Sequence, residues 1–424
     1  MSLMFRGIWV LGLCCAIMPT LIGSQPAFAQ DGPALFRSGQ FAAAETAWRA
    51  EATAAASPSD ESLRGLATLA LLSNRLVDAE KLLTRLHERH PDDKQINGQL
   101  AEVAYRQDQF ERAAEFFRAA DRPAMADKLA SFAERKPYAI SGEADVFEIA
   151  FERTDPLPLV SATLNGGEEV LLLIDTGGGE LILDPEVAKK IGASSFGEEE
   201  GTFAGDKKSA VAHAAIDSIT LGELTVENVP VKLLPTQRFS AVAGGKPVGG
   251  VLGTVFLYHF LATLDYPNGK LILRRPGSDA AERGKSARAS AQRIPFWMAS
   301  DHLILARGAV NGGEECLFFV DTGLAGAAFT CPKSTIEQAK IKLSGQSSQG
   351  VGGGGTVTIT PFMTETLRLG DVERESLLGI AGAFPESLEY GQGFRIGGLI
   401  SHAFFRPYAV TFDFEAMEIL VEER

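Results

Sequence analysis

The chain has 424 residues, of which 45% are hydrophobic and 22% charged, and its formal net charge is −14. This length exceeds one ordinary hydrophobic core, and the composition is typical of folded globular proteins. The sequence therefore predicts two or three domains and excludes a disordered chain or a multispanning membrane protein. Because nucleic acids and anionic lipids are bound by clustered Lys and Arg, we expect no nucleic-acid partner.

Residues 1–29 have the pattern of an export signal. One Arg precedes the apolar run GIWVLGLCCAIMPTLIG, and the sequence AFA places small residues where a signal peptidase reads. We expect cleavage after Ala29, export to a bacterial periplasm or secretion, and no stable membrane anchor afterwards. The alternative is a retained anchor, although Pro19 and Gly23 interrupt the apolar run.

The next region, 30–136, contains an internal repeat. Three segments align at steps of 35 and 34 residues: SGQFAAAETAW (38–48), SNRLVDAEKLL (73–83) and QDQFERAAEFF (107–117). Each places a small Ala three residues after a large apolar residue, and another large residue four further on, which is helical spacing. The region resembles tetratricopeptide repeats. Such an array is either a concave platform for a protein partner or a spacer that stacks against the next domain.

From about residue 137 short alternating or apolar runs broken by Gly, Asn and Asp predict a β region. Here NGGEEVLLLIDTGGG (165–179) returns as NGGEECLFFVDTGLA (311–325), at an offset of 146 residues. Three further pairs follow at an offset of 148: ITLG with LRLG, VGGVLG with IGGLIS, and ATLDY with VTFDF. The sequence therefore predicts two similar lobes, 137–273 and 294–424. The polar segment 274–293 between them is interpreted as an exposed linker.

In both copies, an Asp follows an apolar strand that begins after an Asn-Gly-Gly turn. The strand delivers Asp175 or Asp321 to a turn at its end. Two lobes related by a pseudo-twofold axis would bring these carboxylates face to face. The alternative is that both aspartates are structural turn caps.

These motifs resemble the aspartic proteases, more closely the retropepsin-like and bacterial aspartyl proteases than pepsins. The resemblance implies a mainly β, two-lobed aspartic-protease β-barrel fold over 137–424, preceded by the α-helical repeats. In this family two aspartates share a proton and activate a water molecule. The site residues it implies are the dyad Asp175 and Asp321, the bracing hydroxyls Thr176 and Thr322, and the turn glycines Gly177 and Gly323.

This chain departs from the family pattern at several positions. The apolar-apolar-Gly element that supports each catalytic loop is 251–253 in the first lobe, but its partner ends in Ser401 where Gly is usual. Gly178 and Leu324 cannot hydrogen-bond the dyad through side chains, which predicts a milder pH optimum than that of pepsin. Flap hairpins are expected near 201–210 and 349–358, with glycine-rich tips.

A disulfide is expected between Cys316 and Cys331, which flank the second catalytic loop. We expect the segments that leave and re-enter such a loop to run side by side, within the separation that a disulfide requires. The alternative is two small buried thiols. The histidines form no HExxH pattern and the cysteines no paired CxxC pattern, so we expect no metal and no cofactor.

The function these features predict is that of an exported aspartic endopeptidase acting on a polypeptide substrate. One monomer would suffice for the active site, because each lobe supplies one carboxylate. The repeats would contribute no catalytic group but could bind a protein partner. The alternative is a catalytically weak protease-fold protein that binds peptides or acts as a scaffold.

Overall fold

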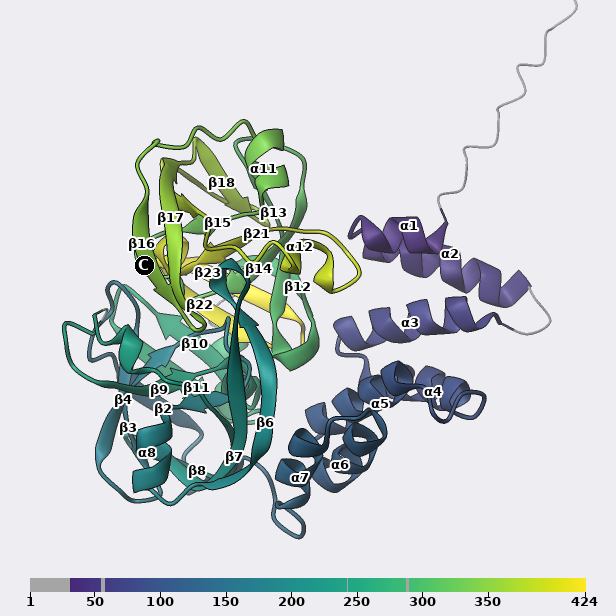
Figure 1. Cartoon of the computed structure of the whole chain (residues 1–424), viewed down its shortest axis with the longest axis horizontal. Coiled ribbons are helices and arrows are strands. Elements are labelled where there is room, and N and C mark those ends of the chain that lie inside the picture. The colour runs from purple at the N-terminus through teal and green to yellow at the C-terminus, as the bar shows by residue number, and fades with distance from the viewer. Residues whose placement is uncertain (1–30, 55–57, 242, 287–289) are drawn as a thin grey trace, which may run out of the picture.

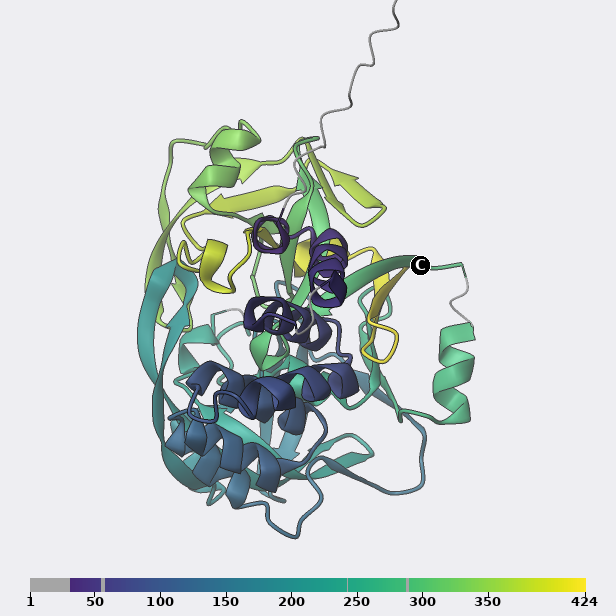
Figure 2. The same cartoon turned by 90° about the vertical axis from the view of Figure 1, so that its right-hand side faces the viewer.

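The computed structural model describes residues 31–54, 58–241, 243–286 and 290–424, and the predicted signal peptide at 1–29 lies outside them. The described chain is mainly β with a helical N-terminal region, as the sequence predicts. The two β lobes lie one above the other in Figure 1, with the helices alongside both. Turning the molecule by 90° brings the helices in front of the lobes (Figure 2).

The N-terminal region is an array of helix pairs. The described helices are α1 (Gly32–Arg37), α2 (Phe41–Ala54), α3 (Asp60–Leu72), α4 (Leu76–His87), α5 (Lys94–Arg106), α6 (Phe110–Ala119) and α7 (Pro123–Ala130). The small Ala44 and Ala79 are fully buried beside the large Trp48, Leu83 and Phe117, which is the packing that the repeat spacing predicts. Among the helices of the described ranges, none is long and apolar enough to cross a bilayer.

The turn inside each helix pair docks on the β lobes. Gly39, Asn74 and Asp108 occupy these turns with φ values of 78°, 54° and 57°, a left-handed conformation that suits these residue types. The contacts are Arg307 Nη2 to Gly39 O (2.7 Å), Asn74 Nδ2 to Phe414 O (3.4 Å), and His259 Nε2 to Asp108 Oδ1 (3.1 Å). Of the two expected arrangements, the array therefore adopts the one that stacks against the next domain.

The first lobe is built on an eight-stranded sheet in the order β1-β8-β5-β9-β4-β3-β7-β6. The elements up to the end of this lobe are β1 (Ala139–Ser141), β2 (Val146–Ala150), β3 (Leu159–Leu164), β4 (Glu169–Ile174), β5 (Leu181–Leu183), α8 (Pro185–Lys190), β6 (Ser194–Phe203), β7 (Lys207–Leu221), β8 (Leu224–Leu233), β9 (Val248–Leu252), α9 (Thr254–Tyr258), β10 (Leu261–Asp265) and β11 (Lys270–Arg274), with single 3-10 turns at Ala204–Asp206 and Gln237–Phe239.

The second lobe belongs to a larger sheet that also includes β2, β10 and β11. Its elements are β12 (Gln292–Met298), a 3-10 turn (Ser300–His302), β13 (Ile304–Val310), β14 (Cys316–Asp321), β15 (Phe329–Thr330), α11 (Lys333–Gln338), β16 (Ser348–Gly352), β17 (Gly355–Met363), β18 (Thr366–Leu369), β19 (Val372–Glu375), β20 (Leu378–Ala381), α12 (Leu388–Gly391), β21 (Ile396–Ser401), α13 (His402–Phe405), β22 (Tyr408–Asp413) and β23 (Glu418–Glu423).

The lobes share one strand plan, as the internal repeat predicts. The strand before each Asp pairs in parallel with the strand of the apolar-apolar-Gly element, β4 with β9 and β14 with β21. Both pairs shift register at the equivalent point, after Leu171 and after Leu317. In each lobe the strand after the Asp loop then pairs antiparallel with that same element.

The lobes are joined by a continuous sheet. Strand β10 of the first lobe pairs antiparallel with β22 of the second, and Thr263 lies opposite Thr411. Their hydroxyl oxygens are 2.8 Å apart. These residues are equivalent in the internal repeat, so the pseudo-twofold axis passes between them. Such a shared sheet holds the two lobes in a fixed relation.

The interpretation of 274–293 as an exposed linker is wrong for much of the segment. Helix α10 (Asp279–Ser286) lies within it, with Ala280, Ala281 and Gly284 buried. The Lys285 ammonium is 2.8 Å from a Glu415 carboxylate oxygen. The packed face consists only of small residues, which is why no apolar run marks it in the sequence.

The predicted disulfide is absent. Cys316 and Cys331 are free thiols, and burial raises the pKa of Cys316 to about 11. The reason is topological, because β21 pairs with β14 on one side and with β15 on the other. Strands on either side of a third strand are about 10 Å apart, beyond the Cα separation that a disulfide spans. The two segments around the loop are therefore not neighbours.

Candidate active site

Both aspartates lie where their strands end at the junction of the lobes. Asp175 follows β4, and Asp321 is the last residue of β14. The residues just before them, Ile174 and Val320, are fully buried. Burial of these apolar strands fixes the direction in which each chain enters the loop, so both carboxyl groups arrive at the pseudo-twofold axis.

The loops are interlocked by Thr176 and Thr322, which are buried. The amide of Thr176 donates to Thr322 Oγ1 (3.0 Å), and the amide of Thr322 donates to Thr176 Oγ1 (3.1 Å). Each hydroxyl then donates across the interface, from Thr176 to Val320 O (2.8 Å) and from Thr322 to Ile174 O (3.1 Å). Every hydroxyl is thus both acceptor and donor, and the two loops brace each other symmetrically.

Gly177 and Gly323 hydrogen-bond the carboxyl groups of their own loops and let each loop pass close to the carboxyl group of the other. Gly177 N donates to Asp175 Oδ1, and Gly323 N donates to Asp321 Oδ1, both at 2.7 Å. A Cβ on Gly177 would overlap the Asp321 carboxyl, and one on Gly323 would overlap that of Asp175. Glycine is therefore required at both positions because each loop passes directly against the opposite carboxyl group.

The two carboxyl groups differ electrostatically despite this symmetry. Burial raises the pKa of both, and each carboxyl group shifts the pKa of the other. The charge of Asp175 adds to burial and holds the pKa of Asp321 well above its usual range. The pKa of Asp175 is raised less, because the amides of Gly177, Gly178 and Gly323 and the Asp321 side chain favour its ionised form. The pair as a whole therefore keeps one proton to a higher pH than an isolated carboxyl group would.

Ser401, which stands where the family pattern has Gly, supports the second loop. Its hydroxyl accepts from Leu324 N (3.1 Å) and donates to Leu324 O (3.2 Å). In the first lobe, a Cβ on Gly253 would overlap the carbonyl oxygens of Gly179 and Glu180. The lobes therefore use different side chains at this equivalent position because their loops approach it differently.

The predicted flaps are hairpins whose tips meet. Strands β6 and β7 form the first around Ala204–Asp206, and β16 and β17 form the second. Arg238 Nη1 donates to Gly353 O in the second tip (2.6 Å). In the first tip, Asp206 accepts from the amides of Glu386 (2.9 Å) and Ser387 (3.2 Å) and from the Ser387 hydroxyl. The first flap is thus fastened to the opposite lobe.

Two features near the site are not indicated by sequence reasoning alone. One is the Asp206 latch on Ser387, which joins two polar loops far apart in the chain. The other is Glu180, buried beside Lys128 of helix α7. A charged residue inside the apolar stretch GGGELIL signals that a buried partner exists, but nothing in the sequence identifies Lys128 as that partner.

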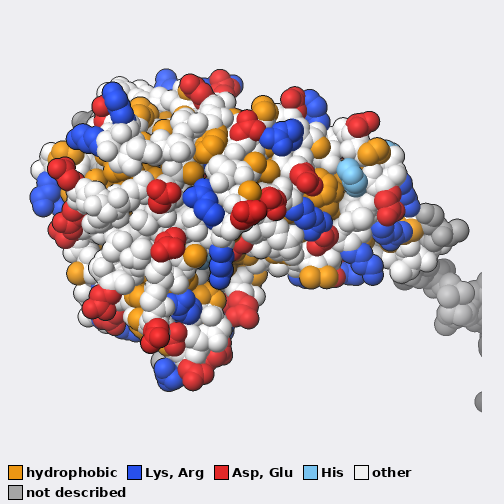
Figure 3. All heavy atoms as spheres, turned by 90° about the horizontal axis from the view of Figure 1, so that it is seen from below, with side chains coloured by type: hydrophobic (Ala, Val, Ile, Leu, Met, Phe, Trp, Pro, Cys, Tyr) orange, Lys and Arg blue, Asp and Glu red, His pale blue; other side chains and the backbone are white. Residues whose placement is uncertain are grey.

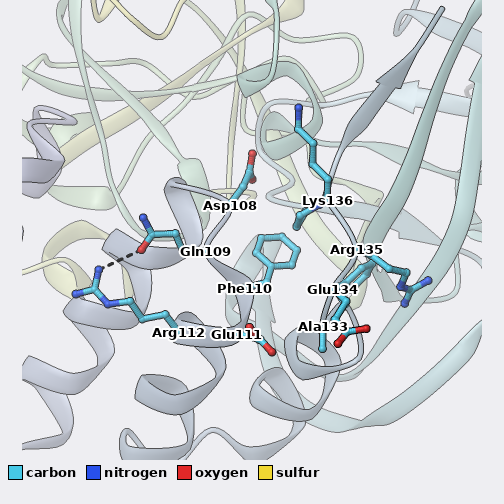
Figure 4. A pocket seen from close by; sticks show the side chains of 11 residues that line it. Asp108, Gln109, Phe110, Glu111, Arg112, Ala133, Glu134, Arg135 and Lys136 are labelled. Carbon is cyan, nitrogen blue, oxygen red and sulfur yellow. Dashed lines mark hydrogen bonds between the residues drawn. The ribbon is translucent and has the colours of Figure 1, made fainter.

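A surface pocket of about 480 Å³ lies away from both aspartates. It is lined by 108–112 and 132–137, at the junction of the helices and the first lobe (Figure 4). Arg112 bonds the neighbouring Gln109 there. Acidic and basic side chains are interspersed over the face shown in Figure 3. Within the described ranges, no group of three or more His, Cys, Asp or Glu side chains is arranged to hold a metal ion.

Comparison with known proteins yields two matches. Residues 160–256 match an aspartyl protease family model. A tetratricopeptide repeat model matches residues 70–131. The chain therefore combines tetratricopeptide repeats with an aspartyl protease domain, in the predicted order. The protease match includes Asp175, and Asp321 is related to it through the internal duplication. No curated protein gives a significant match to the chain.

Proposed function

We propose that the protein is an aspartic endopeptidase. The observation that carries the proposal is the half-buried pair of Asp175 and Asp321, each carboxyl group lying against the glycine of the opposite loop, with the two loops interlocked through Thr176 and Thr322. Two carboxyl groups that share one proton are suited to general acid and base catalysis at one carbonyl.

In the proposed reaction, ionised Asp175 accepts a proton from a water molecule as the water oxygen attacks the peptide carbonyl carbon. Protonated Asp321 donates a hydrogen bond, then its proton, to the developing oxyanion. Collapse of the tetrahedral intermediate breaks the C–N bond as Asp175 gives its proton to the leaving nitrogen. One hydroxyl of the intermediate returns its proton to Asp321 as the C=O bond re-forms, so the dyad regains its starting protonation state. Thr176 and Thr322 keep the two carboxyl groups in place throughout these steps.

The proposed substrate is a polypeptide, and we propose that it binds beneath the two flaps. Exclusion of water by the flaps would strengthen the electrostatic interactions with the dyad. We further propose that the chain is exported to a periplasm or secreted after cleavage behind Ala29. A protein partner of the repeats would bind surfaces that do not contact the lobes.

A second candidate is a peptide-binding protein with weak turnover. The observation that favours it is the fastening of the first flap, through Asp206, to residues 386–387 of the other lobe. If this closure were permanent, substrates would be excluded from the dyad. The endopeptidase proposal instead requires the flap to open during turnover.

Cleavage of an unfolded protein, followed by mass spectrometry of the products, tests the proposal. Wild type is compared with Asp175→Asn, Asp321→Asn and a control, Asp217→Asn, in which the exposed Asp lies on β7. We expect new peptide termini with wild type and the control, and a loss of about 10³-fold or more for each dyad variant. Equal activity in all four proteins would contradict the proposal, and none in wild type would favour the binding alternative.

A further inference from the structure

A fully buried ion pair links the helical repeats to the first catalytic loop. Lys128 of α7 has no exposed side-chain surface, and its Nζ lies 2.5 Å from Glu180 Oε2. The Tyr105 hydroxyl of α5 donates to the other carboxylate oxygen, at 2.7 Å. Both oxygens of this carboxylate are therefore held by side chains of the repeats.

Glu180 is the last residue of the loop that begins at Asp175. The loop is held on one side by hydrogen bonds from Thr254 N to Gly178 O (2.8 Å) and from Val255 N to Gly179 O (2.9 Å). The next residue begins strand β5. Lys128 and Tyr105 thus hydrogen-bond the last residue of the loop, where the chain leaves the dyad.

The second lobe anchors its loop differently. Gly326 is the equivalent of Glu180 in the internal repeat, and a Cβ there would meet nothing within 4 Å. That loop is instead bonded by Ser401 of its own lobe through Leu324. In the described part of the chain, the hydrogen bonds from side chains of the helical region therefore go to the first loop, whereas those of the second loop come from its own lobe.

Helix α7 also reaches the first flap. Arg122 Nη2 lies 2.7 Å from Glu199 Oε2 on β6, and His213 Nε2 on β7 lies 3.2 Å from the same oxygen. A Cβ on Gly197 would come within 3.2 Å of Ala124. Helix α7 and its N-cap residue Arg122 thus contact both the first flap and the Asp175 loop.

Burying an ion pair between two domains has a large desolvation cost, and apolar residues of the same size often stabilise such an interface as well or better. What a paired charge adds is a fixed geometry. We propose that Lys128 is a positioning residue, which acts through Glu180 to hold the Asp175 loop in its catalytic conformation. The repeats are then a part of the catalytic unit. This inference rests on the proposed endopeptidase function.

The test compares Lys128→Met with Leu83→Ala in the full-length protein. Leu83 is fully buried in an apolar cluster formed by 63–103 of the repeats, away from the lobes. Its truncation destabilises the same region without touching the loop. Steady-state cleavage of a short peptide is measured at a temperature where circular dichroism shows every variant to be folded. Hydrogen exchange of the Thr254 and Val255 amides is measured under the same conditions.

For Lys128→Met we expect kcat to fall about ten- to hundredfold with KM within about twofold, because misplacement of a reacting group slows chemistry more than binding. Exchange at Thr254 and Val255 should become faster. Leu83→Ala should lower the melting temperature and leave kcat unchanged, and it should speed exchange at Thr254 and Val255 no more than at other buried amides of the lobes. Unchanged kcat and exchange in a folded Lys128→Met would overturn the proposal, and so would equal effects in the two variants.

Tyr105→Phe keeps the inference testable if Lys128→Met does not fold. It removes one hydrogen bond to Glu180 and preserves the ring that stacks on Phe110. We expect a smaller change, about two- to fivefold in kcat, in the same direction. The exchange readout needs no turnover. An inactive wild type would therefore refute the endopeptidase function, while unchanged exchange in both variants would refute the anchoring role.

Discussion

The dyad aspartates have the same sequence context but different pKa shifts, and this asymmetry sets the pH dependence of the site. Because the pKa of Asp321 is raised well above 3.8, the folded state binds more protons than the unfolded state above that pH. The free energy of unfolding must then fall as pH rises from about 4 through the folded-state pKa. The alkaline limb of activity should likewise lie above the range of an ordinary carboxyl group.

Asp321→Asn should remove the loss of folding stability that deprotonation of Asp321 causes as the pH rises. We expect it to raise the free energy of unfolding by more than about 1 kcal/mol at pH 7, with the gain vanishing below about pH 4. Denaturant unfolding at several pH values measures it, with Asp217→Asn as the control. A constant difference between the variant and wild type at every pH would show that titration of Asp321 is not the cause.

Ser401→Ala should destabilise the second loop. It removes the hydroxyl that bonds both Leu324 N and Leu324 O, at a cost of about 1–2 kcal/mol, and it should lower kcat because the Asp321 loop loosens. Ser62→Ala is the matched control, since Ser62 is a buried serine in the repeats that bonds Glu51. Urea unfolding and steady-state kinetics should show similar stability losses but a kcat decrease only for Ser401→Ala.

The sequence predicts that the two aspartates come together, but it does not predict that their pKa values differ. Asp175 and Asp321 are predictable because each ends an apolar strand of a duplicated motif. Their unequal pKa values depend on which amides point at which oxygen, and on burial by both lobes. The support from Ser401 was missed for a similar reason, since its hydroxyl bonds a backbone position 77 residues away.

The first flap hairpin is fastened to the second lobe by hydrogen bonds to Asp206, and these bonds can be tested by mutation. Asp206→Ala removes three hydrogen bonds that fasten the first flap to 386–387, so closure over the substrate should weaken. We expect KM for a peptide to rise about three- to tenfold with a smaller change in kcat. Asp371→Ala, at the exposed turn between β18 and β19, controls for loss of a surface charge. An unchanged KM would show that the latch has no part in closure.

Helix and strand positions were predicted best where a strong periodic pattern exists. The repeats at 38–48, 73–83 and 107–117 follow such a pattern, whereas the flaps were expected from the family resemblance and their glycine-rich tips. Helix α10 was missed because its buried face contains only Ala and Gly. The disulfide between Cys316 and Cys331 was wrongly predicted because strand order, which places β21 between the two segments, cannot be read from their spacing.

At the scale of the whole molecule, the helical array and the lobes should unfold together. Phe41 of α2 packs against Trp297 and Phe394 of the second lobe, at ring-centroid distances of 5.1 and 5.0 Å. The buried Arg106 of α5 donates to Met298 O and Ala299 O. An apolar and hydrogen-bonded interface of this kind couples the stability of the parts it joins.

Phe41→Ala should therefore destabilise the entire chain by about 3–5 kcal/mol. Differential scanning calorimetry should give one transition for the wild type and one, at lower temperature, for the variant. A separate low-temperature transition for the helical region would mean that the array unfolds independently. The sequence could not predict this coupling, because Gly39, Asn74 and Asp108 are ordinary turn residues until their contacts are seen.

We propose that the two lobes of a single chain form one active site. The most direct test of this claim is a mixture of Asp175→Asn and Asp321→Asn, each inactive alone, refolded together and assayed on a peptide. A site built within one chain predicts that the mixture stays inactive, since every molecule lacks one carboxylate. Recovery of activity on mixing would contradict the claim, because it would mean that Asp175 of one molecule pairs with Asp321 of another.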